Sequence, residues 1–241
     1  MHTMFKKYVG YAGGGVKMGV NIYPIKLGFD HCYIIRGEKT VMIDGGSPNQ
    51  VNQFKKALAR LSIKPEEIEL IIMTHGHWDH IASAKEIKTI TGAKIVMHKA
   101  EKEWLEKGLK PMPPGISKWG RIMNRLITIF LPLVHIPATT VDITIGDEGL
   151  SLDAYRIPGK IIYTPGHSSG SISVLLETGE AFVGDMAMNG LPMRFGPGLP
   201  IFAQDLVKLK ESWRLLLDQG VKTIYPAHGE PFSADVIRKA I

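Results

Sequence analysis

The chain has 241 residues, of which 44% are hydrophobic and 22% charged, and its formal net charge is +6. This length is enough for one large domain with its own core, and the composition is ordinary for a globular protein. The basic residues are scattered, without a long basic run, so no nucleic-acid partner is expected. The single cysteine, Cys32, excludes an internal disulfide and a cysteine-based metal site.

Residues 1–19 lack the apolar core of a signal peptide and include the run Gly13-Gly14-Gly15. We therefore expect a cytoplasmic protein. Cys32 opens the strand-like run 32–35 and is predicted to be a buried apolar side chain rather than a nucleophile.

The first half of the chain contains β-rich runs separated by glycine-containing turns. These runs predict strands over residues 20–27, 31–36, 40–43, 68–73 and 94–97. Ser47 and Pro48 predict a helix start, with Ser47 as N-cap and Pro48 at the first helical position. The apolar residues behind them recur at helical spacing: Val51, Phe54, Leu58 and Leu61. A second helix is expected over residues 81–90.

Residues 100–140 lie outside this strand pattern, and we expect a helical insertion there. Within residues 116–136, apolar side chains recur every three or four positions: Trp119, Ile122, Met123, Leu126, Ile127, Phe130 and Leu131. The other side carries Lys118, Arg121, Asn124 and Arg125. A membrane-spanning helix needs about 20 apolar residues, and the basic residues with Pro132 exclude one. Three interpretations remain: a helix packed on the core, a cap over a functional site, or a helix lying on a membrane surface.

The second half of the chain also contains predicted strands followed by a helix. Strands are predicted over residues 160–163, 171–176, 180–183 and 222–225. An apolar stripe predicts a helix that ends near Gly220: Leu206, Leu209, Trp213, Leu216 and Leu217. A short helix is expected over residues 233–240. Two sets of strands, each with helices, predict two packed sheets covered by helices.

The most informative stretch is Thr74-His75-Gly76-His77-Trp78-Asp79-His80, directly after a predicted strand. Each ring nitrogen of a buried imidazole needs a hydrogen-bond or metal partner, so a cluster of histidines would destabilise a purely hydrophobic core. Neutral imidazole and ionised carboxylate are ligands of zinc and of related divalent ions. The stretch therefore predicts a metal site.

Three further ligand-type residues follow predicted strands and stand beside glycine or proline. They are His167 in Pro165-Gly166-His167, Asp185 after Gly184, and His228 in Pro226-Ala227-His228. Loops at strand ends can bring polar groups from a rigid sheet to one shared point.

Together these motifs resemble the metallo-β-lactamase superfamily, over nearly the whole chain. The resemblance implies an α/β fold, a four-layer αββα sandwich, formed by a single domain over residues 1–241. It implies that His75, His77 and His167 bind one metal, that Asp79, His80 and His228 bind a second, and that Asp185 bridges the two. Asp44, in Ile43-Asp44-Gly45, matches a turn that supports the ligands from outside, although it also reads as an ordinary turn aspartate.

The implied activity is hydrolysis. Two divalent ions about 3.5–4 Å apart polarise a substrate oxygen and acidify a bridging water, so that hydroxide forms near neutral pH. We predict Asp79 and Asp185 to be catalytic as well as metal-binding. Zinc is the default ion, and iron, manganese or cobalt would accept the same ligands.

The sequence differs from several known subfamilies of this superfamily, and these differences reduce the number of candidate substrates. Classical β-lactamases of this fold lack the combination of Asp79, His80 and Asp185. Only a short segment follows His228, where glyoxalase II carries a glutathione-binding helical domain. Met188 stands where quorum-quenching lactonases place a tyrosine. The stretch 186–195, rich in methionine, is interpreted as an apolar wall near the metals or as core packing.

We therefore expect a small-molecule substrate: an ester, thioester or lactone with an apolar acyl part. The alternatives are a phosphodiesterase or nuclease, a mono-iron persulfide dioxygenase, and a metal-binding scaffold without activity. Tyr225 and His98 are the weak candidates for a proton donor, and the remaining histidines, His2, His31 and His135, are expected to be structural or exposed. The oligomeric state stays open.

Overall fold

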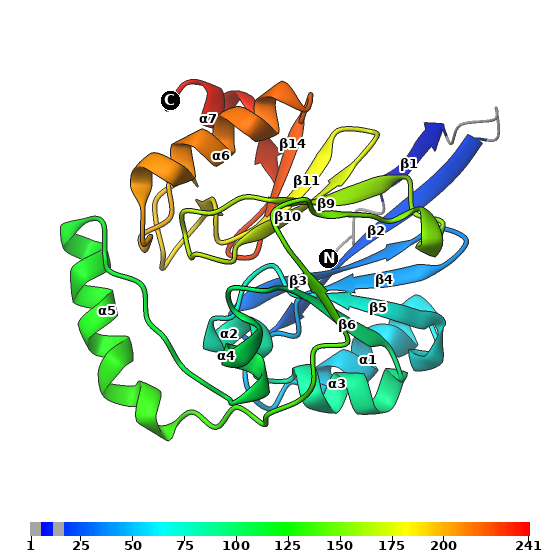
Figure 1. The fold of residues 1–241 in the computed structure, drawn as a ribbon, viewed down its shortest axis with the longest axis horizontal. Helices are drawn as coiled ribbons and strands as arrows, with labels where there is room; N and C mark the ends of the chain where they lie inside the picture. The colour runs from blue at the N-terminus through cyan, green and yellow to red at the C-terminus, as the bar shows by residue number, and fades with distance from the viewer. Residues whose placement is uncertain (1–5, 12–16) are drawn as a thin grey trace.

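The computed structural model of the chain describes residues 6–11 and 17–241, and contains two large β-sheets stacked between layers of helices (Figure 1). This arrangement confirms the predicted αββα sandwich. In the described part of the chain, no helix is long and apolar enough to cross a membrane.

The first sheet has the strand order β1 to β7. Its strands are β1 Lys6–Tyr11, β2 Lys17–Leu27, β3 Asp30–Arg36, β4 Thr40–Ile43, β5 Ile68–Ile72, β6 Lys94–His98 and β7 Ile143–Ile145. Each neighbouring pair from β1 to β4 is antiparallel, whereas each neighbouring pair from β4 to β7 is parallel.

The second sheet has the order β15-β14-β11-β10-β9-β8, and a small two-stranded sheet joins β12 to β13. The strands are β8 Leu150–Ser151, β9 Gly159–Tyr163, β10 Ile172–Leu176, β11 Glu180–Gly184, β12 Met188–Asn189, β13 Pro197–Gly198, β14 Thr223–Pro226 and β15 Phe232–Ser233. Within the second sheet, only β11 and β14 pair in parallel among the described strands.

Helices cover both outer faces, and one helix stands at the end of the molecule (Figure 1). They are α1 Val51–Leu61, α2 Trp78–Ile81, α3 Ala84–Thr91, α4 Lys102–Glu106, α5 Lys118–Phe130, α6 Leu206–Asp218 and α7 Asp235–Arg238. The 3-10 turns are η1 Pro65–Glu67, η2 Leu131–Leu133 and η3 Asp153–Tyr155.

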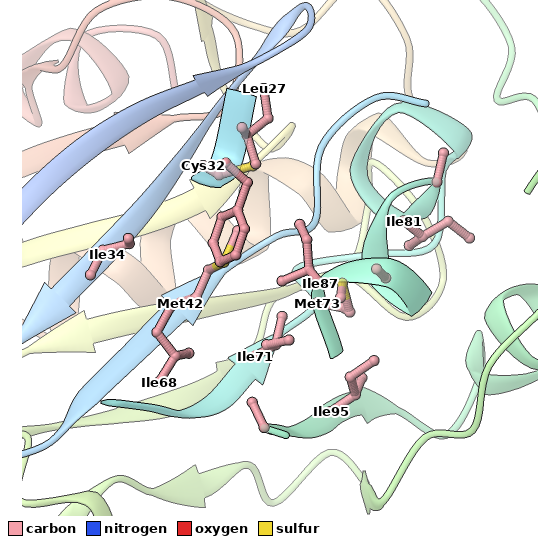
Figure 2. Packing of buried hydrophobic residues seen from close by; sticks show 14 of the residues in the cluster. Leu27, Cys32, Ile34, Met42, Ile68, Ile71, Met73, Ile81, Ile87 and Ile95 are labelled. Carbon is pink, nitrogen blue, oxygen red and sulfur yellow. The ribbon is translucent and has the colours of Figure 1, made fainter. Parts of the chain in front are cut away.

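Strand β4 contributes to two separate cores. Because successive side chains of a strand point to opposite faces, Val41 and Ile43 pack between the two sheets, whereas Met42 packs under the helices of the first sheet. Figure 2 shows the second of these cores, with Met42 near Cys32 and Ile71. Cys32 is fully buried there, as predicted.

The predicted helix start at Ser47 is wrong. Helix α1 begins at Val51 with Gln50 in the N-cap position. The Ser47 hydroxyl instead donates to Asp30 Oδ2 at 3.0 Å. A tertiary partner therefore takes the hydroxyl that a local cap would have used.

The single helix expected over residues 81–90 is two helices, α2 and α3. The break lies at Ala82 and Ser83, where the Ser83 hydroxyl donates to Ser47 O at 2.7 Å and accepts from Gln50 N at 2.9 Å. This serine side chain ties the start of α3 to the turn before α1.

Candidate metal centre

Four of the predicted site residues follow strand β5. The strand ends at Ile72, the next turn carries His75 and His77, and α2 then begins at Trp78. Asp79 and His80 therefore lie in the first turn of a helix. Gly76 separates the two histidines where any side chain would approach Trp104 within 2.7 Å, so close packing requires glycine there.

The other three predicted residues come from the second sheet. His167 lies in the loop between β9 and β10, Asp185 follows β11 and His228 follows β14. Since β11 and β14 are parallel neighbours, their carboxyl ends meet at one edge of the sheet. Asp185 and His228 are brought together in this way.

The structure brings all seven predicted residues into one cluster. Within each group below, the candidate ligand atoms lie within 4.8 Å of one another. The groups are His75, His77 and His167; Asp79, His80 and His228 together with Asp30; and His75, His80 and Asp185.

Asp185 lies between the first two groups. Its Oδ1 is 3.4 Å from His80 Nε2, and its Oδ2 is 3.7 Å from His167 Nε2 and 3.4 Å from His228 Nε2. One carboxylate therefore reaches side chains of both groups, as a bridging ligand must.

Several atoms of the cluster make no hydrogen bond with the described residues. Among the described residues, the Nε2 atoms of His75, His77 and His80 and Oδ1 of Asp185 are buried without a hydrogen bond. Leaving a buried polar group unpaired costs about 1–3 kcal/mol. Imidazole nitrogens and carboxylate oxygens are the donor set of zinc and related divalent ions. The residues therefore fit a metal centre.

Neighbouring groups orient three of the histidine rings through Nδ1. His80 Nδ1 lies 3.0 Å from Asp44 Oδ2, His75 Nδ1 lies 3.1 Å from Thr74 Oγ1, and His167 Nδ1 lies 2.9 Å from Phe202 O. For His75 and His80, contacts of this kind select the tautomer that leaves Nε2 free for a metal. His167 Nε2 instead lies 2.9 Å from His77 Nδ1, and an ion in the first group would replace this contact.

Asp44 connects the first sheet to this cluster. It adopts a positive φ of 60° and accepts hydrogen bonds from the backbone N–H and the hydroxyl of Thr74 at 2.8 and 2.9 Å. The contact with His80 places Asp44 outside the candidate ligands, where the resemblance put it.

Burial and neighbouring charges set the protonation of the cluster. Burial and then the charge of His167 lower the pKa of His77 to about 3, so His77 is neutral near pH 7 and able to bind a metal. Burial also lowers the pKa of His228, but Asp185 outweighs it and raises that pKa well above the ordinary value. Burial raises the pKa of Asp185, yet His228 and His80 hold it well below the ordinary value.

Sequence reasoning missed Asp30. It is fully buried at the start of β3, and its Oδ1 has no hydrogen bond and lies 3.4 Å from His228 Nε2. Burial and then Asp79 raise its pKa well above the ordinary value. A single aspartate after Gly28-Phe29 reads as a turn residue, so no local signal distinguishes it.

Glu101 is the second residue that the sequence did not reveal. This fully buried carboxylate accepts the N–H of Gly76 at 2.7 Å and the N–H of Gly170 at 2.6 Å. Gly76 lies between His75 and His77, and Gly170 lies in the loop of His167. One side chain therefore ties together the two loops that carry the first group.

A cavity of about 270 Å³ opens on the cluster. Five predicted site residues line it: His77, Asp79, His167, Asp185 and His228. The facing side is apolar and comes mainly from the insertion and the 186–203 loop, including Met112, Met123, Leu126, Ile127, Phe130, Met188, Met193 and Phe202. Trp78 and Phe29 also line the cavity.

The remaining candidates lie elsewhere. Tyr225 packs against Tyr33 between the sheets at a ring distance of 5.6 Å, and His98 stacks on Tyr163 at 4.4 Å. Neither residue belongs to the lining of the cavity. His31 is partly buried and His135 exposed, and His2 lies outside the described residues.

Comparison with known proteins identifies the family that shares this arrangement of residues. The model of the family described as the metallo-beta-lactamase superfamily matches residues 25–228. The metallo-beta-lactamase fold-containing protein ST1585 of Sulfurisphaera tokodaii is 29% identical over 214 residues, which cover 86% of this chain and 75% of that protein. The probable metallo-hydrolase MJ0888 of Methanocaldococcus jannaschii is 29% identical over 205 residues, with 82% and 86% covered. The hydroxyacylglutathione hydrolase GloC of Haemophilus influenzae is 25% identical, with 72% and 74% covered.

Solved structures share the fold. The structure of ST1585 from Sulfolobus tokodaii superposes with a TM-score of 0.66 at 23% identity, covering 91% of this chain and 84% of that one. The di-iron-bound form of TTHA1623 superposes with a TM-score of 0.65 at 19% identity, covering 90% and 97%.

Proposed function

Because the chain belongs to the metallo-beta-lactamase superfamily, we propose that it is a metal-dependent hydrolase of an ester, thioester or lactone with an apolar acyl part. The observation that carries this proposal is the cavity that joins candidate metal ligands to an apolar wall. A bound substrate would place its carbonyl against the ligands and its acyl chain against the wall. GloC, whose named substrate is a thioester, represents the same reaction class among the relatives.

In this proposal two ions occupy the cluster. His75, His77 and His167 would hold one ion, Asp79, His80 and His228 the other, and Asp185 both. Zinc suits this donor set, and iron is the main alternative because TTHA1623 was solved in a di-iron-bound form. When bound, two such ions polarise a carbonyl oxygen and lower the pKa of a water molecule shared between them.

The residues of the chain would bind the substrate, exclude water and accept a proton. Asp79 lines the cavity with its side chain 13% exposed, so its carboxylate faces the substrate and is the candidate proton acceptor. Ile127 and Met123 of α5 form part of the apolar wall. The insertion over residues 100–140 would thus cap the active site.

The cavity also limits the acyl chain. A volume of about 270 Å³ lies near the lower end of the range for small-molecule sites. We therefore expect chains of medium length to be the best substrates. Each buried methylene is worth about 0.8 kcal/mol, or about a fourfold gain in kcat/KM, until the cavity is full.

The test is a series of p-nitrophenyl esters from acetyl to octanoyl, with matched thioesters and lactones, assayed on zinc-loaded protein. Turnover should rise with chain length and disappear with a chelator or with Asp185→Asn. Ile127→Ala should reduce kcat/KM for octanoyl esters and leave acetyl esters nearly unchanged. Ile90→Ala, on helix α3 away from the cavity, is the matched control.

Other outcomes would assign a different chemistry. Cleavage of bis(p-nitrophenyl) phosphate without turnover of any carbonyl substrate would make the protein a phosphodiesterase. One iron per chain, with oxygen consumption on a persulfide, would make it a dioxygenase. Either result would overturn the proposal.

A further inference from the structure

The insertion becomes strongly basic after its first few residues. Residues 107–141 contain five basic residues and no aspartate or glutamate, while the formal net charge of the whole chain is +6. The basic residues are Lys107, Lys110, Lys118, Arg121 and Arg125. This segment is therefore much more basic than the chain as a whole.

Helix α5 presents its charges and its apolar side chains in adjacent rows. Lys118, Arg121 and Arg125 follow one another at helical spacing, are exposed, and form no ion pair with a described residue. The next row holds Ile122, Leu126, Ile129 and, beyond the helix, Leu133, also exposed. The most exposed of these are Ile129 at 67% and Leu133 at 82%.

A neighbouring loop extends the apolar row. Leu191 and Phe195 are 68% and 86% exposed, and the Trp119 indole N–H donates to Pro192 O at 3.1 Å, which joins this loop to α5. Large apolar side chains exposed together indicate an interaction surface. Figure 1 shows α5 at the end of the molecule, on the opposite side from α1.

We propose that α5 and the 191–195 loop dock on an anionic phospholipid membrane. A helix with an apolar row beside a basic row lies in the plane of a bilayer interface. The unpaired Lys and Arg side chains complement anionic headgroups, and the tryptophan at the junction is a residue that favours the interface.

The alternative occupants fit these observations less well. In a two-fold dimer the same patch meets itself, so the basic residues of both copies would enter one interface to which residues 107–141 contribute no acidic side chain. A nucleic acid would use the charges and leave the exposed apolar row without a partner. A lipid surface uses both rows.

The exposed apolar side chains of α5 are continuous with the lining of the cavity. Leu126 and Phe130 are 47% and 63% exposed and also line the cavity above the candidate metal ligands. An acyl chain could therefore pass from the bilayer to the wall without crossing water. This consequence rests on the proposed function, whereas the docking itself does not, because metal-free protein can be tested.

The test is cosedimentation of the full chain with vesicles of phosphatidylcholine, with and without phosphatidylglycerol. We expect binding to the anionic vesicles at low salt and at least tenfold weaker binding to the neutral ones. Ile129→Asp with Leu133→Asp should weaken binding at least tenfold, and so should Arg121→Glu with Arg125→Glu. These side chains are exposed, and thermal melting of each variant checks the fold.

The matched control is Lys55→Glu with Lys56→Glu, the same charge change on exposed residues of α1; it should bind like the wild type. Equal losses in both charge variants would overturn the proposal, as would no vesicle binding. A dimer in analytical ultracentrifugation that Ile129→Asp with Leu133→Asp dissociates, without vesicle binding, would assign the surface to a second copy. Binding of duplex DNA that only the charge variant weakens would assign it to a nucleic acid.

Discussion

The substitution Glu101→Gln tests whether the metal site is organised before any ion binds. The Glu101 carboxylate accepts one N–H from each of the two loops that carry the first group of histidines. The glutamine side chain has the same shape but only one oxygen. Its amide nitrogen must therefore face the backbone N–H of either Gly76 or Gly170, and that buried N–H loses its acceptor.

The cost follows from these two contacts. A hydrogen bond to a charged group contributes about 1.5–3 kcal/mol, and a buried N–H left unpaired costs about 1–3 kcal/mol. Because these terms overlap, we expect a loss of about 2–4 kcal/mol in the free energy of unfolding. For a chain of this length that corresponds to a fall in Tm of about 5–15 °C. If zinc binding must restore the order of both loops, the same 2–4 kcal/mol corresponds to a fall in zinc affinity of about 30- to 700-fold.

The assay compares metal-free and zinc-loaded protein by thermal denaturation, and measures affinity by competition with a chromophoric chelator. Glu103→Gln is the matched control, since Glu103 forms only an exposed pair with Lys107, and its removal should change little. An unchanged Tm and zinc affinity in Glu101→Gln, relative to Glu103→Gln, would refute the idea that this carboxylate holds the loops.

Three further predictions follow from other buried groups. Gly170→Ala would place a methyl group 2.8 Å from Glu101 Cγ, so it should lower Tm in the same way, and a Tm equal to the wild type would contradict this packing. Asp30→Asn should weaken binding of the second zinc by about 10- to 100-fold and spare the first, as a two-step titration can show; equal weakening of both would argue against its place beside His228. Burial lowers the pKa of His98 below 6.5, so the unfolded state takes up this proton first and stability falls as pH drops below about 6.5. His98→Gln should therefore lose less stability than the wild type between about pH 7 and pH 5 in urea titrations, and equal losses would show that His98 does not contribute.

The strands were predictable because their signal is local. Thr40–Ile43 is a run of β-branched and apolar residues, and its observed bounds match the prediction. Side-chain alternation then determines which residue enters which core, as Val41 and Met42 show. The predicted ligands also have a local signature: five of them stand beside a glycine or in a Gly/Pro turn after a strand, and Asp79 and His80 follow within the same His-rich stretch.

The residues that were missed depend on partners far along the chain. Glu101 contacts Gly170 across 69 positions, and Asp30 meets His228 from the other end of the sequence. Ser47 has the composition of an N-cap, yet Asp30 takes its hydroxyl. Local propensity is a weak predictor wherever a tertiary hydrogen bond competes for the same group.

The arrangement of buried acids explains how one cluster between the ends of the two sheets can hold five imidazoles. Asp44 and Asp185 both contact His80, and Asp185 also contacts His228, so each histidine with a raised pKa has a carboxylate beside it. Among the described residues His77 forms no ion pair, and burial keeps it neutral. One set of histidines, His80 and His228, is therefore stabilised by charge, whereas His75 and His77 have lowered pKa values and Nε2 atoms without a hydrogen bond. A bound ion would satisfy those nitrogens and replace the proton on the others, so folding and metal binding should stabilise each other, and the metal-free protein should unfold at a lower temperature than the loaded one.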